Sequence, residues 1–310
     1  MNEQPIDWVA CDPASQRVLE LARKVTGTST TVLITGESGT GKDQLARLIH
    51  ELSPRRNQPY LKIDCASLPQ ELVESELFGH ERGAFTGAVE RKLGRLEMAG
   101  SGTIVLDEVA ALSPATQSKL LRVLEERRFE RLGGVDTLTI EARLIALTNS
   151  DLARAAAAKT FREDLYFRLS VLTIQVPPLR ERRSDVAPLT EHLLARLTAM
   201  HGRPGTTLGD SARRALEAYD WPGNIRELKN ALERALIFGK NAELSLEDLP
   251  ENIRAADSGM PAGMRSLEQI EREAIQKTLE GTRYKITRAA AILGISRKTL
   301  LDKRKKYGLQ

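Results

Sequence analysis

The sequence predicts an α/β protein with a parallel sheet, followed by a small helical domain and a C-terminal helix-turn-helix. Short apolar runs rich in β-branched residues alternate with helical patterns such as residues 117–126, which is typical of a sheet covered by helices on both faces. Three runs carry this signal: residues 31–35, 103–106 and 143–148. From residue 184 to about residue 250 the strand signals stop, and helical periodicity takes over.

The domain boundaries follow from where these patterns change. Three amphipathic segments, residues 186–200, 211–219 and 224–238, define the helical domain, and small residues punctuated by Gly and Pro follow it. Such a composition is typical of a linker. We therefore expect an α/β domain, a helical domain, a linker and a helix-turn-helix domain at residues 1–183, 184–254, 255–265 and 266–310.

The composition indicates a globular protein without membrane insertion. Of the 310 residues, 41% are hydrophobic and 28% are charged, and no apolar run approaches the roughly 20 residues that span a bilayer. Residues 1–5 lack the layout of a signal peptide, so we expect a cytoplasmic protein. Cys11 and Cys65 are the two cysteines, which argues against a disulfide framework and predicts two small buried side chains.

The positive charge is concentrated at the C-terminus. Residues 281–310 hold nine basic residues and one acid, Asp302, a net charge of +8. Because the whole chain carries +4, the other 280 residues carry −4. A step of this kind predicts a polyanion-binding module attached to a near-neutral domain.

A glycine-rich segment between a predicted strand and a predicted helix has the context of a phosphate-binding loop. Glycines let backbone N–H groups turn toward a phosphate, the helix N-terminus adds partial positive charge, and Lys42 reaches the outer phosphates. The residue after the lysine normally carries a hydroxyl for Mg²⁺, but here it is Asp43. The predicted ATP-binding residues are Gly36, Glu37, Ser38, Gly39, Thr40, Gly41, Lys42 and Asp43.

Two strand ends supply the polar residues that nucleotide hydrolysis needs. Asp107 ends the strand at residues 103–106 and is placed to hold Mg²⁺, and Glu108 is placed to polarise the attacking water. Asn149 follows the strand at residues 143–148, where its amide would orient water or sense the γ-phosphate. Acids at a strand end are commonly only solvated, but an upstream phosphate-binding loop favours the metal site.

The segment Gly83, Ala84, Phe85, Thr86, Gly87 and Ala88 is not required by an ATPase core. Glycines on both sides of Phe85 and Thr86 favour the tip of a loop that changes shape easily. This pattern predicts a contact with another macromolecule. The alternative is a buried loop anchored by the Phe85 ring.

The basic tail contains a helix-turn-helix pattern. Residues 287–293 predict one helix, Gly294 and Ile295 a turn, and Ser296 the N-cap of a second helix that runs to Tyr307. The residues expected to meet DNA are Ser296, Arg297, Lys298, Thr299 and Lys303. The alternative is a basic helical pair that binds an acidic protein or anionic lipid.

Taken in order, the motifs resemble those of bacterial enhancer-binding proteins, the AAA+ activators of sigma-54 RNA polymerase. The resemblance rests on residues 36–42, 76–80, 83–88, 107–108, 161–168 and 221–228, and it extends over nearly the whole chain. It implies an AAA+ P-loop αβα sandwich with a helical lid and an all-α Fis-like helix-turn-helix domain. It also implies a homo-oligomeric ring, usually a hexamer, with ATP and Mg²⁺ bound between subunits.

The resemblance assigns roles to residues that are otherwise ambiguous. Arg162 and Arg168 match arginine fingers that reach the γ-phosphate on a neighbouring subunit, although pairing with Glu163 and Asp164 is the local alternative. Arg226 matches the lid arginine that contacts nucleotide in its own subunit. Asp64 stands where the family usually has an asparagine that restrains the catalytic glutamate, so the two acids share a proton, are bridged by a cation, or form a weakened brake.

The expected function is therefore ATP-dependent activation of the sigma-54 RNA polymerase holoenzyme from upstream enhancer DNA, with residues 83–88 in contact with sigma-54. Two other functions remain open: a nucleotide-sensing DNA-bound repressor or architectural protein, and a AAA+ loader for another substrate. Because the phosphate-binding loop begins at residue 36, we expect no receiver domain before it. Regulation would then come from expression level or from a partner protein in trans.

Overall fold

The computed structural model describes residues 8–255, 271, 274–276, 278–279, 282 and 284–307. It divides into two compact units, Met1–Pro250 and Glu251–Gln310, which are described separately. Most of the linker expected at residues 255–265 lies outside the described residues.

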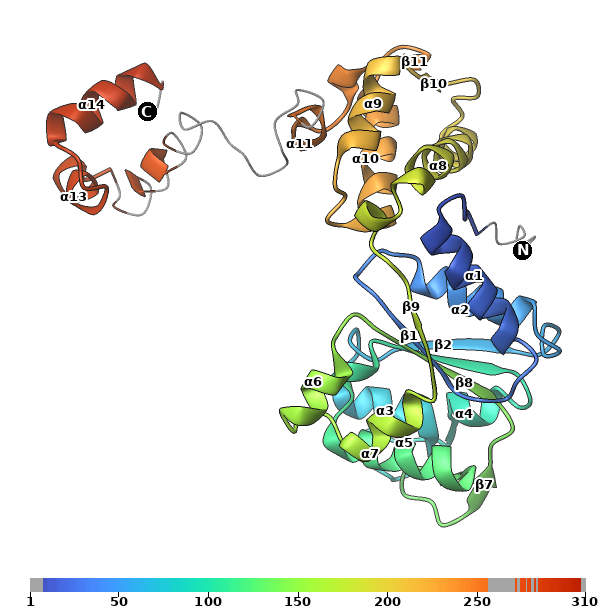
Figure 1. Cartoon of the computed structure of the whole chain (residues 1–310). Helices are drawn as coiled ribbons and strands as arrows, with labels where there is room; N and C mark the ends of the chain where they lie inside the picture. Colours follow the sequence, from blue (N-terminus) through green and yellow to red (C-terminus); the bar gives the residue numbers. More distant parts are fainter. Residues whose placement is uncertain are drawn as a thin grey trace. The chain divides into compact units, whose positions relative to one another are not determined.

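A five-stranded parallel sheet forms the centre of the first unit (Figure 1). Its spatial order is β2 (Tyr60–Asp64), β5 (Thr103–Asp107), β8 (Arg143–Thr148), β1 (Val32–Thr35) and β9 (Leu172–Gln175). Register pairs Asp64 with Asp107 and Thr35 with Thr148. The carboxyl ends of the strands therefore lie along one edge, where parallel sheets place their ligand sites. The three predicted strands are confirmed, and the sequence missed β2 and β9.

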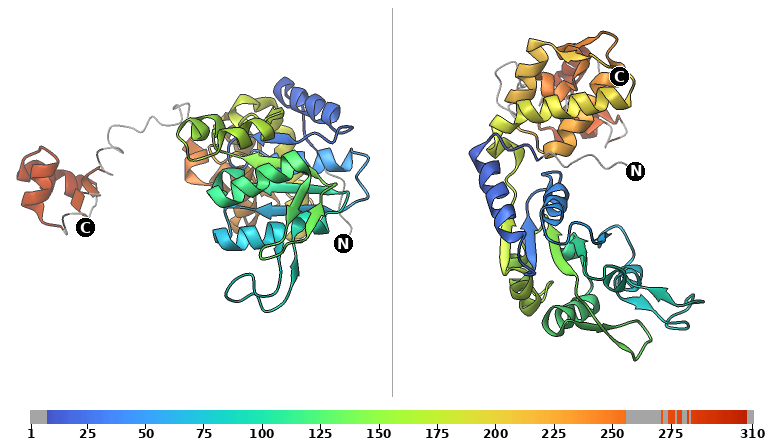
Figure 2. Two further views of the ribbon diagram at one scale, coloured as in Figure 1. Left: turned by 90° about the horizontal axis from the view of Figure 1, so that it is seen from below. Right: turned by 90° about the vertical axis from the view of Figure 1, so that its right-hand side faces the viewer.

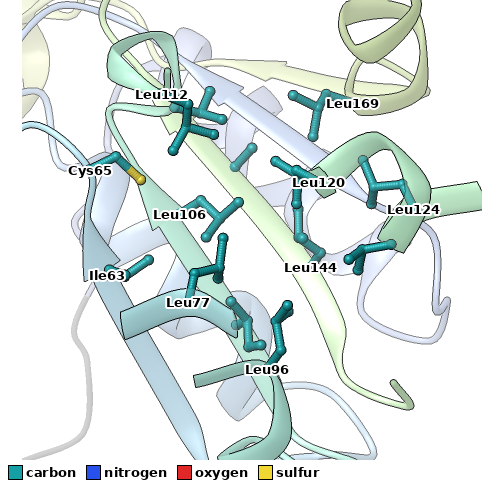
Figure 3. Close-up of a cluster of buried hydrophobic side chains, with 14 of the residues drawn as sticks. Ile63, Cys65, Leu77, Leu96, Leu106, Leu112, Leu120, Leu124, Leu144 and Leu169 are labelled. Atoms are coloured by element: carbon teal, nitrogen blue, oxygen red, sulfur yellow. The ribbon is translucent and has the colours of Figure 1, made fainter. Parts of the chain in front are cut away.

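Alternating side chains of the central strands enter two hydrophobic clusters on opposite faces of the sheet. Ile104 and Leu106 belong to one cluster, whereas Val105 between them belongs to the other. Figure 3 shows the first cluster, which packs against α3 (Gln70–Phe78), α5 (Pro114–Glu126) and α7 (Glu163–Leu169). The second packs against α1 (Pro13–Val25) and α2 (Lys42–Glu51). The sheet is thus covered on both faces, as the sequence predicted.

Short elements complete this layer, namely α4 (Arg95–Met98), α6 (Leu152–Ala157) and the 3₁₀ turn η1 (Val109–Ala111). Two small antiparallel pairs join β3 (Gly79–His80) to β4 (Lys92–Leu93), and β6 (Arg128–Glu130) to β7 (Thr137–Thr139). Figure 2 shows the loop between β3 and β4 projecting from the α/β body.

The helical subdomain contains α8 (Val186–Met200), α9 (Asp210–Ala218) and α10 (Asn224–Phe238). The first and last match the ranges predicted from periodicity. The smaller elements are η2 (Leu179–Glu181), η3 (Arg183–Asp185), β10 (Thr207–Leu208), β11 (Glu243–Leu244) and η4 (Leu246–Asp248). Trp221 is fully buried, and its indole N–H donates to the Leu216 carbonyl at 2.9 Å, so it anchors the start of α10.

The second unit contains α11 (Glu251–Arg254), α13 (Ile286–Ile292) and α14 (Arg297–Lys306). Gly294 has φ +66° in the turn before α14, and the Ser296 hydroxyl accepts from the Thr299 N–H at 3.0 Å. Ala289 and Ala290 are buried together with Leu300 in a small core. The predicted helix-turn-helix and its serine cap are confirmed.

The two cysteines differ from expectation in one respect. Cys65 is buried, and burial raises the pKa of its thiol to about 12. Cys11 is exposed, so the prediction of two buried cysteines was wrong for this residue. Cys11 lies in the surface segment before α1, where its backbone N–H donates to Asp185 Oδ1 at 2.8 Å.

Arg143 fixes the end of α1 to the centre of the sheet. Its side chain is 1% exposed and donates to the carbonyls of Val25 at 2.7 Å, and of Thr26 and Thr30 at 3.4 Å. Burial lowers the pKa of this guanidinium to about 10. The charge is tolerated in the interior because these carbonyl groups accept its hydrogen bonds.

Replacing Arg143 with Met should lower the free energy of unfolding by about 3 kcal/mol, because buried carbonyl groups lose their donors. The exposed Arg128 provides the matched control, and Arg128→Met should change stability by less than about 0.5 kcal/mol. Urea unfolding of both variants measures the difference. Equal stability of the two would show that Arg143 does not hold the sheet to α1.

Candidate functional site

The phosphate-binding loop joins β1 to α2 and is shaped by its glycines. Gly39 has φ +78°, and a Cβ atom at this position would lie 2.5 Å from the Gly223 carbonyl oxygen. The loop therefore touches the helical subdomain directly. Lys42 Nζ donates to the carbonyls of Gly36 and Glu37 at 2.8 and 3.0 Å. Burial lowers the pKa of Lys42, against the opposing effect of Glu108 and Asp107.

A cavity of about 420 Å³ opens between this loop and the helical subdomain. Both subdomains contribute to its lining. Arg226, on the lid, donates to the Ser38 hydroxyl of the phosphate-binding loop at 2.6 Å. Other lid residues line this cavity although no motif assigned them to ATP binding: Arg196, Ile225, Lys229 and Asn230.

Glu37 and Asn224 connect the loop to the lid. The Glu37 carboxylate accepts two hydrogen bonds from Arg180, at 2.6 and 2.8 Å, and these hydrogen bonds hold its pKa below the usual value. Asn224 is fully buried and donates to Glu37 Oε2 at 3.2 Å and to the Ser38 carbonyl at 3.1 Å. The side chain of Glu37, which the sequence placed among the ATP-binding residues, therefore contacts the lid.

Glu108 and Asn149 meet at the carboxyl edge of the sheet. Glu108 has φ +52° and ψ +52°, a conformation that costs a side-chain-bearing residue about 1 kcal/mol or more. Its Oε2 accepts from the Asn149 backbone N–H at 3.2 Å. The Asn149 side chain accepts from the Ser150 hydroxyl at 3.2 Å. A strained carboxylate facing the phosphate-binding loop is typical of a catalytic position.

The Lys62 ammonium lies between Asp43 and Asp107, where a metal ion was predicted. Its Nζ atom is 2.5 Å from Asp43 Oδ1 and 2.7 Å from Asp107 Oδ2. Burial alone would lower the pKa of Lys62, but hydrogen bonds to Asp107 and Asp43 outweigh it and raise the pKa. The period of a β-strand could have predicted this contact. Lys62 and Asp64 are two residues apart on β2 and so share one face of the strand, and Asp64 pairs with Asp107.

Asp64 has a local role in this structure. Its Oδ1 accepts from the backbone N–H groups of Ala66 and Ser67 at 3.0 and 3.1 Å. This arrangement is an Asx turn at the end of β2. The carboxylate therefore stabilises the chain reversal after the strand, which an asparagine oxygen at the same position would do equally well.

Arg162 is the N-cap of α7 and Arg168 lies in its last turn, away from the phosphate-binding loop of the same chain. Arg162 makes two hydrogen bonds to Asp164, at 2.7 and 3.0 Å, and these lower the pKa of that carboxyl group. Arg168 donates to the Leu124 carbonyl at 3.3 Å. Within the part of the chain that the structure describes, neither arginine lines the cavity beside Lys42.

The loop at residues 83–88 is a tight reversal with its aromatic ring at the surface. Gly83 N–H donates to the Ala88 carbonyl at 2.8 Å, and Gly87 has φ +109°. Phe85 is 41% exposed and makes an edge contact with His80, with 5.0 Å between ring centroids. Thr86 is exposed as well. A Cβ atom at either glycine would meet no other atom, so the loop has room to change shape.

In the second unit, Arg297 and Lys298 are exposed in the first turn of α14. Lys303 differs from them, because its ammonium pairs with Glu271, which also accepts from the Tyr307 hydroxyl at 2.6 Å. Lys303 therefore ties α14 to the segment that precedes α13. None of the helices in the described ranges is long and apolar enough to cross a membrane.

Comparison with known proteins gives three consecutive matches. A sigma-54 interaction domain model matches residues 8–175, a AAA+ ATPase lid domain residues 180–265, and a Fis-family bacterial regulatory protein model residues 266–307. The chain belongs to the sigma-54 interaction domain family. Its α/β domain, lid and helix-turn-helix are thus the AAA+ arrangement that the motifs predicted.

The chain is also similar to curated regulatory proteins. The chain is 43% identical over 307 residues to the regulatory protein AtoC of Escherichia coli K12, covering 96% of this chain and 67% of that protein. It is 43% identical over 292 residues to the Nif-specific regulatory protein of Azotobacter vinelandii, covering 92% of this chain and 55% of that protein. The chain thus spans about half to two thirds of the length of these curated relatives.

A solved structure shares the fold. NtrX from Brucella abortus, crystallised in complex with ATP, superposes with a TM-score of 0.75 at 33% sequence identity, covering 98% of this chain and 70% of that chain. The DNA-bound repressor without remodelling activity is not favoured, because the sigma-54 interaction domain model matches residues 8–175, most of the α/β domain.

The contact between Glu37 and Arg180 predicts coupling between the lid and the nucleotide. Arg180→Ala should cost less than about 1 kcal/mol of stability, because both side chains are partly exposed, but should accelerate release of fluorescent ADP about fivefold. Arg183→Ala is the control, since Arg183 pairs with Asp220 inside the lid. Stopped-flow release at the same rate in both variants would contradict the coupling.

The contacts of Lys303 change the expectation for the DNA-binding face. Arg297→Ala should weaken binding to every DNA sequence and reduce the salt slope by about one unit, as for one lost phosphate contact. Lys303→Ala should lower the melting temperature of the domain and change the salt slope less, because Lys303 is already paired with Glu271. Fluorescence anisotropy titrations at several salt concentrations measure the slope for each variant. An equal fall of the slope in Arg297→Ala and Lys303→Ala would contradict this prediction.

Proposed function

We propose that this chain is an ATP-hydrolysing activator of sigma-54 RNA polymerase. Three findings support the proposal: the cavity beside Lys42, membership of the sigma-54 interaction domain family, and the likeness to an NtrX structure that holds ATP. The observation that carries it is the loop at residues 83–88, which presents an exposed Phe85 on a projecting hairpin of a nucleotide-binding domain (Figure 2).

The residues at the cavity fit ATP and Mg²⁺. Asp43 and Asp107 offer carboxylate oxygens, the ligands that Mg²⁺ prefers, and in this structure they already share one cation, the Lys62 ammonium. Lys42 and the N–H groups at the start of α2 would hold the phosphates, and Arg226 would close over them from the lid. When bound, Mg²⁺ neutralises charge that develops on the transferred phosphoryl group.

Glu108 is the proposed base that accepts a proton from the attacking water. The backbone N–H of Asn149 fixes the Glu108 carboxylate at 3.2 Å, so the strained conformation of Glu108 is supported from the next strand. Asn149 would orient the water or report the γ-phosphate. Asp64, engaged in its own turn, leaves Glu108 less restrained than an asparagine brake would.

Arg162 and Arg168 are proposed to act across a subunit interface in a hexameric ring. Both lie on or beside α7 and remain outside the cavity of their own chain. The Arg162 side chain is 44% exposed, pairs with Asp164 and donates to the Ser118 hydroxyl at 3.1 Å, so it is accessible to a neighbouring γ-phosphate. Its planar guanidinium would stabilise negative charge in the transition state.

Phe85 and Thr86 are proposed to contact sigma-54, with Gly83 and Gly87 allowing the loop to change shape as the nucleotide changes. The helix-turn-helix, through Ser296, Arg297, Lys298 and Thr299, would bind enhancer DNA upstream of the promoter. A protein that acts on bacterial RNA polymerase would be located in the cytoplasm. A regulatory protein acting in trans would control it.

The proposal is tested by ATP-dependent open-complex formation with purified sigma-54 polymerase on supercoiled DNA that carries an upstream site. Wild type should open the promoter. Glu108→Gln should bind ATP normally while turnover falls by about 10² or more, the effect of a lost general base, and promoter opening should fail. Promoter opening without ATP, or no effect of wild type under any nucleotide condition, would reject the proposed function.

The role of the loop predicts a separation of activities. Phe85→Ala should abolish promoter opening while ATPase activity persists and stability falls by only about 1 kcal/mol, because the ring makes one edge contact with His80. Phe78→Ala is the control, because Phe78 is 1% exposed in the core and its truncation should cost about 3 to 5 kcal/mol. If Phe85→Ala lost stability, ATPase activity and opening together, the ring would be a core anchor instead.

A further inference from the structure

Lys62 lies at the nucleotide site, and the proposed mechanism gives it no role. It comes from the edge strand β2 and reaches both the helix that carries Asp43 and the strand end that carries Asp107. Its side chain is 34% exposed, whereas that of Asp107 is 16% exposed and that of Asp43 is 53% exposed. The ammonium therefore lies between a sheltered carboxylate and an open one.

The charges around this point explain why a cation is needed there. Asp43, Asp107 and Glu108 bring three carboxylates to the cavity that also has to accept a polyphosphate. A hydroxyl in place of Asp43 would leave one negative charge fewer, so this chain carries an additional repulsion against phosphate. Lys62 offsets that charge at a distance of 2.5 Å.

We propose that Lys62 is a positioning residue for the metal site, an inference that rests on the proposed function. Its ammonium holds the Asp43 and Asp107 carboxylates together before Mg²⁺ binds. Asp107 would be the ligand of a bound Mg²⁺, while Lys62 would keep Asp43, its closer partner. Asp43 thus acts on the nucleotide through Lys62, and Asp107 is the carboxylate that binds the metal.

This arrangement makes Lys62 a competitor of Mg²⁺ and a helper of nucleotide binding without metal. Removing its charge frees Asp107 for the metal and at the same time exposes the phosphates to an uncompensated Asp43. Mg²⁺ should then bind more tightly, whereas nucleotide without metal should bind more weakly. A general loss of folding would instead weaken both kinds of binding.

The test measures binding of fluorescent ADP to the full chain with excess EDTA and across a MgCl₂ titration. Lys62→Met should weaken ADP binding in EDTA by about fivefold, the scale of one partly exposed ion pair, and should shift the Mg²⁺ midpoint to a lower concentration. Lys62→Arg is the matched control, because it retains the charge and should keep both values close to wild type.

A double-mutant cycle tests whether Asp43 acts through Lys62. Asp43→Asn alone should raise the Mg²⁺ midpoint, because Lys62 is then left with Asp107 as its only carboxylate. In the Lys62→Met background, Asp43→Asn should not raise the midpoint. A rise of equal size in both backgrounds would make Asp43 a direct metal ligand and overturn the inference.

Failure of this inference is distinguishable from failure of the proposed function. If wild type binds no ADP with or without Mg²⁺, the ATPase proposal itself is rejected. If wild type binds ADP with no response to Mg²⁺, the inference about Lys62 fails and the proposed function stands. If wild type responds to Mg²⁺ but Lys62→Met matches it in both EDTA affinity and midpoint, Lys62 has no part in the site. Thermal melting of each variant confirms that the compared proteins are folded.

Discussion

The buried amide of Asn224 holds the phosphate-binding loop and the lid together, and the nucleotide site depends on it. Its oxygen accepts from the Leu179 N–H at 2.7 Å, and its nitrogen donates to the Ser38 carbonyl at 3.1 Å. An isosteric carboxylate would supply no donor, and a shorter side chain would leave both partners unsatisfied in the interior. Because Asn224 also begins α10 with φ +52°, the orientation of the whole lid helix is linked to the position of the loop.

The second constraint is electrostatic. Two lysines, Lys42 and Lys62, lie among carboxylates at the carboxyl edge of the sheet, and their pKa values shift in opposite directions. Burial dominates at Lys42, which lowers its pKa, whereas the direct contacts with Asp107 and Asp43 dominate at Lys62, which raises its pKa. Of these two lysines, Lys42 therefore has the environment that favours its charge less. A polyphosphate would supply the negative charge that it lacks.

The sequence predicted those parts of the fold that carry a continuous apolar run or a clear helical period. Strands β5 and β8 are apolar on both faces and α8 and α10 have clear amphipathic periods, so their ranges were read directly. Strands β2 and β9 are the edges of the sheet, and each exposes part of its length, so neither forms a continuous apolar run. Motif residues that are contiguous in the sequence were found. The contacts of Lys62, Arg180 and Asn224 were missed, because contacts across the fold leave no pattern along the chain.

Arg162 combines a fixed main chain with an exposed side chain, which its proposed action in a neighbouring subunit requires. Its backbone N–H donates to Gln117 Oε1 at 2.9 Å, and Gln117 is buried and donates in turn to the Leu112 carbonyl at 2.8 Å. The main chain at the start of α7 is therefore fixed to α5. The guanidinium is held mainly by Asp164, in a pair whose members are 44% and 48% exposed, and such pairs exchange readily with water. A doubly charged phosphate oxygen cluster competes well for a bidentate guanidinium, so the side chain can leave Asp164 while the helix that carries it stays in place.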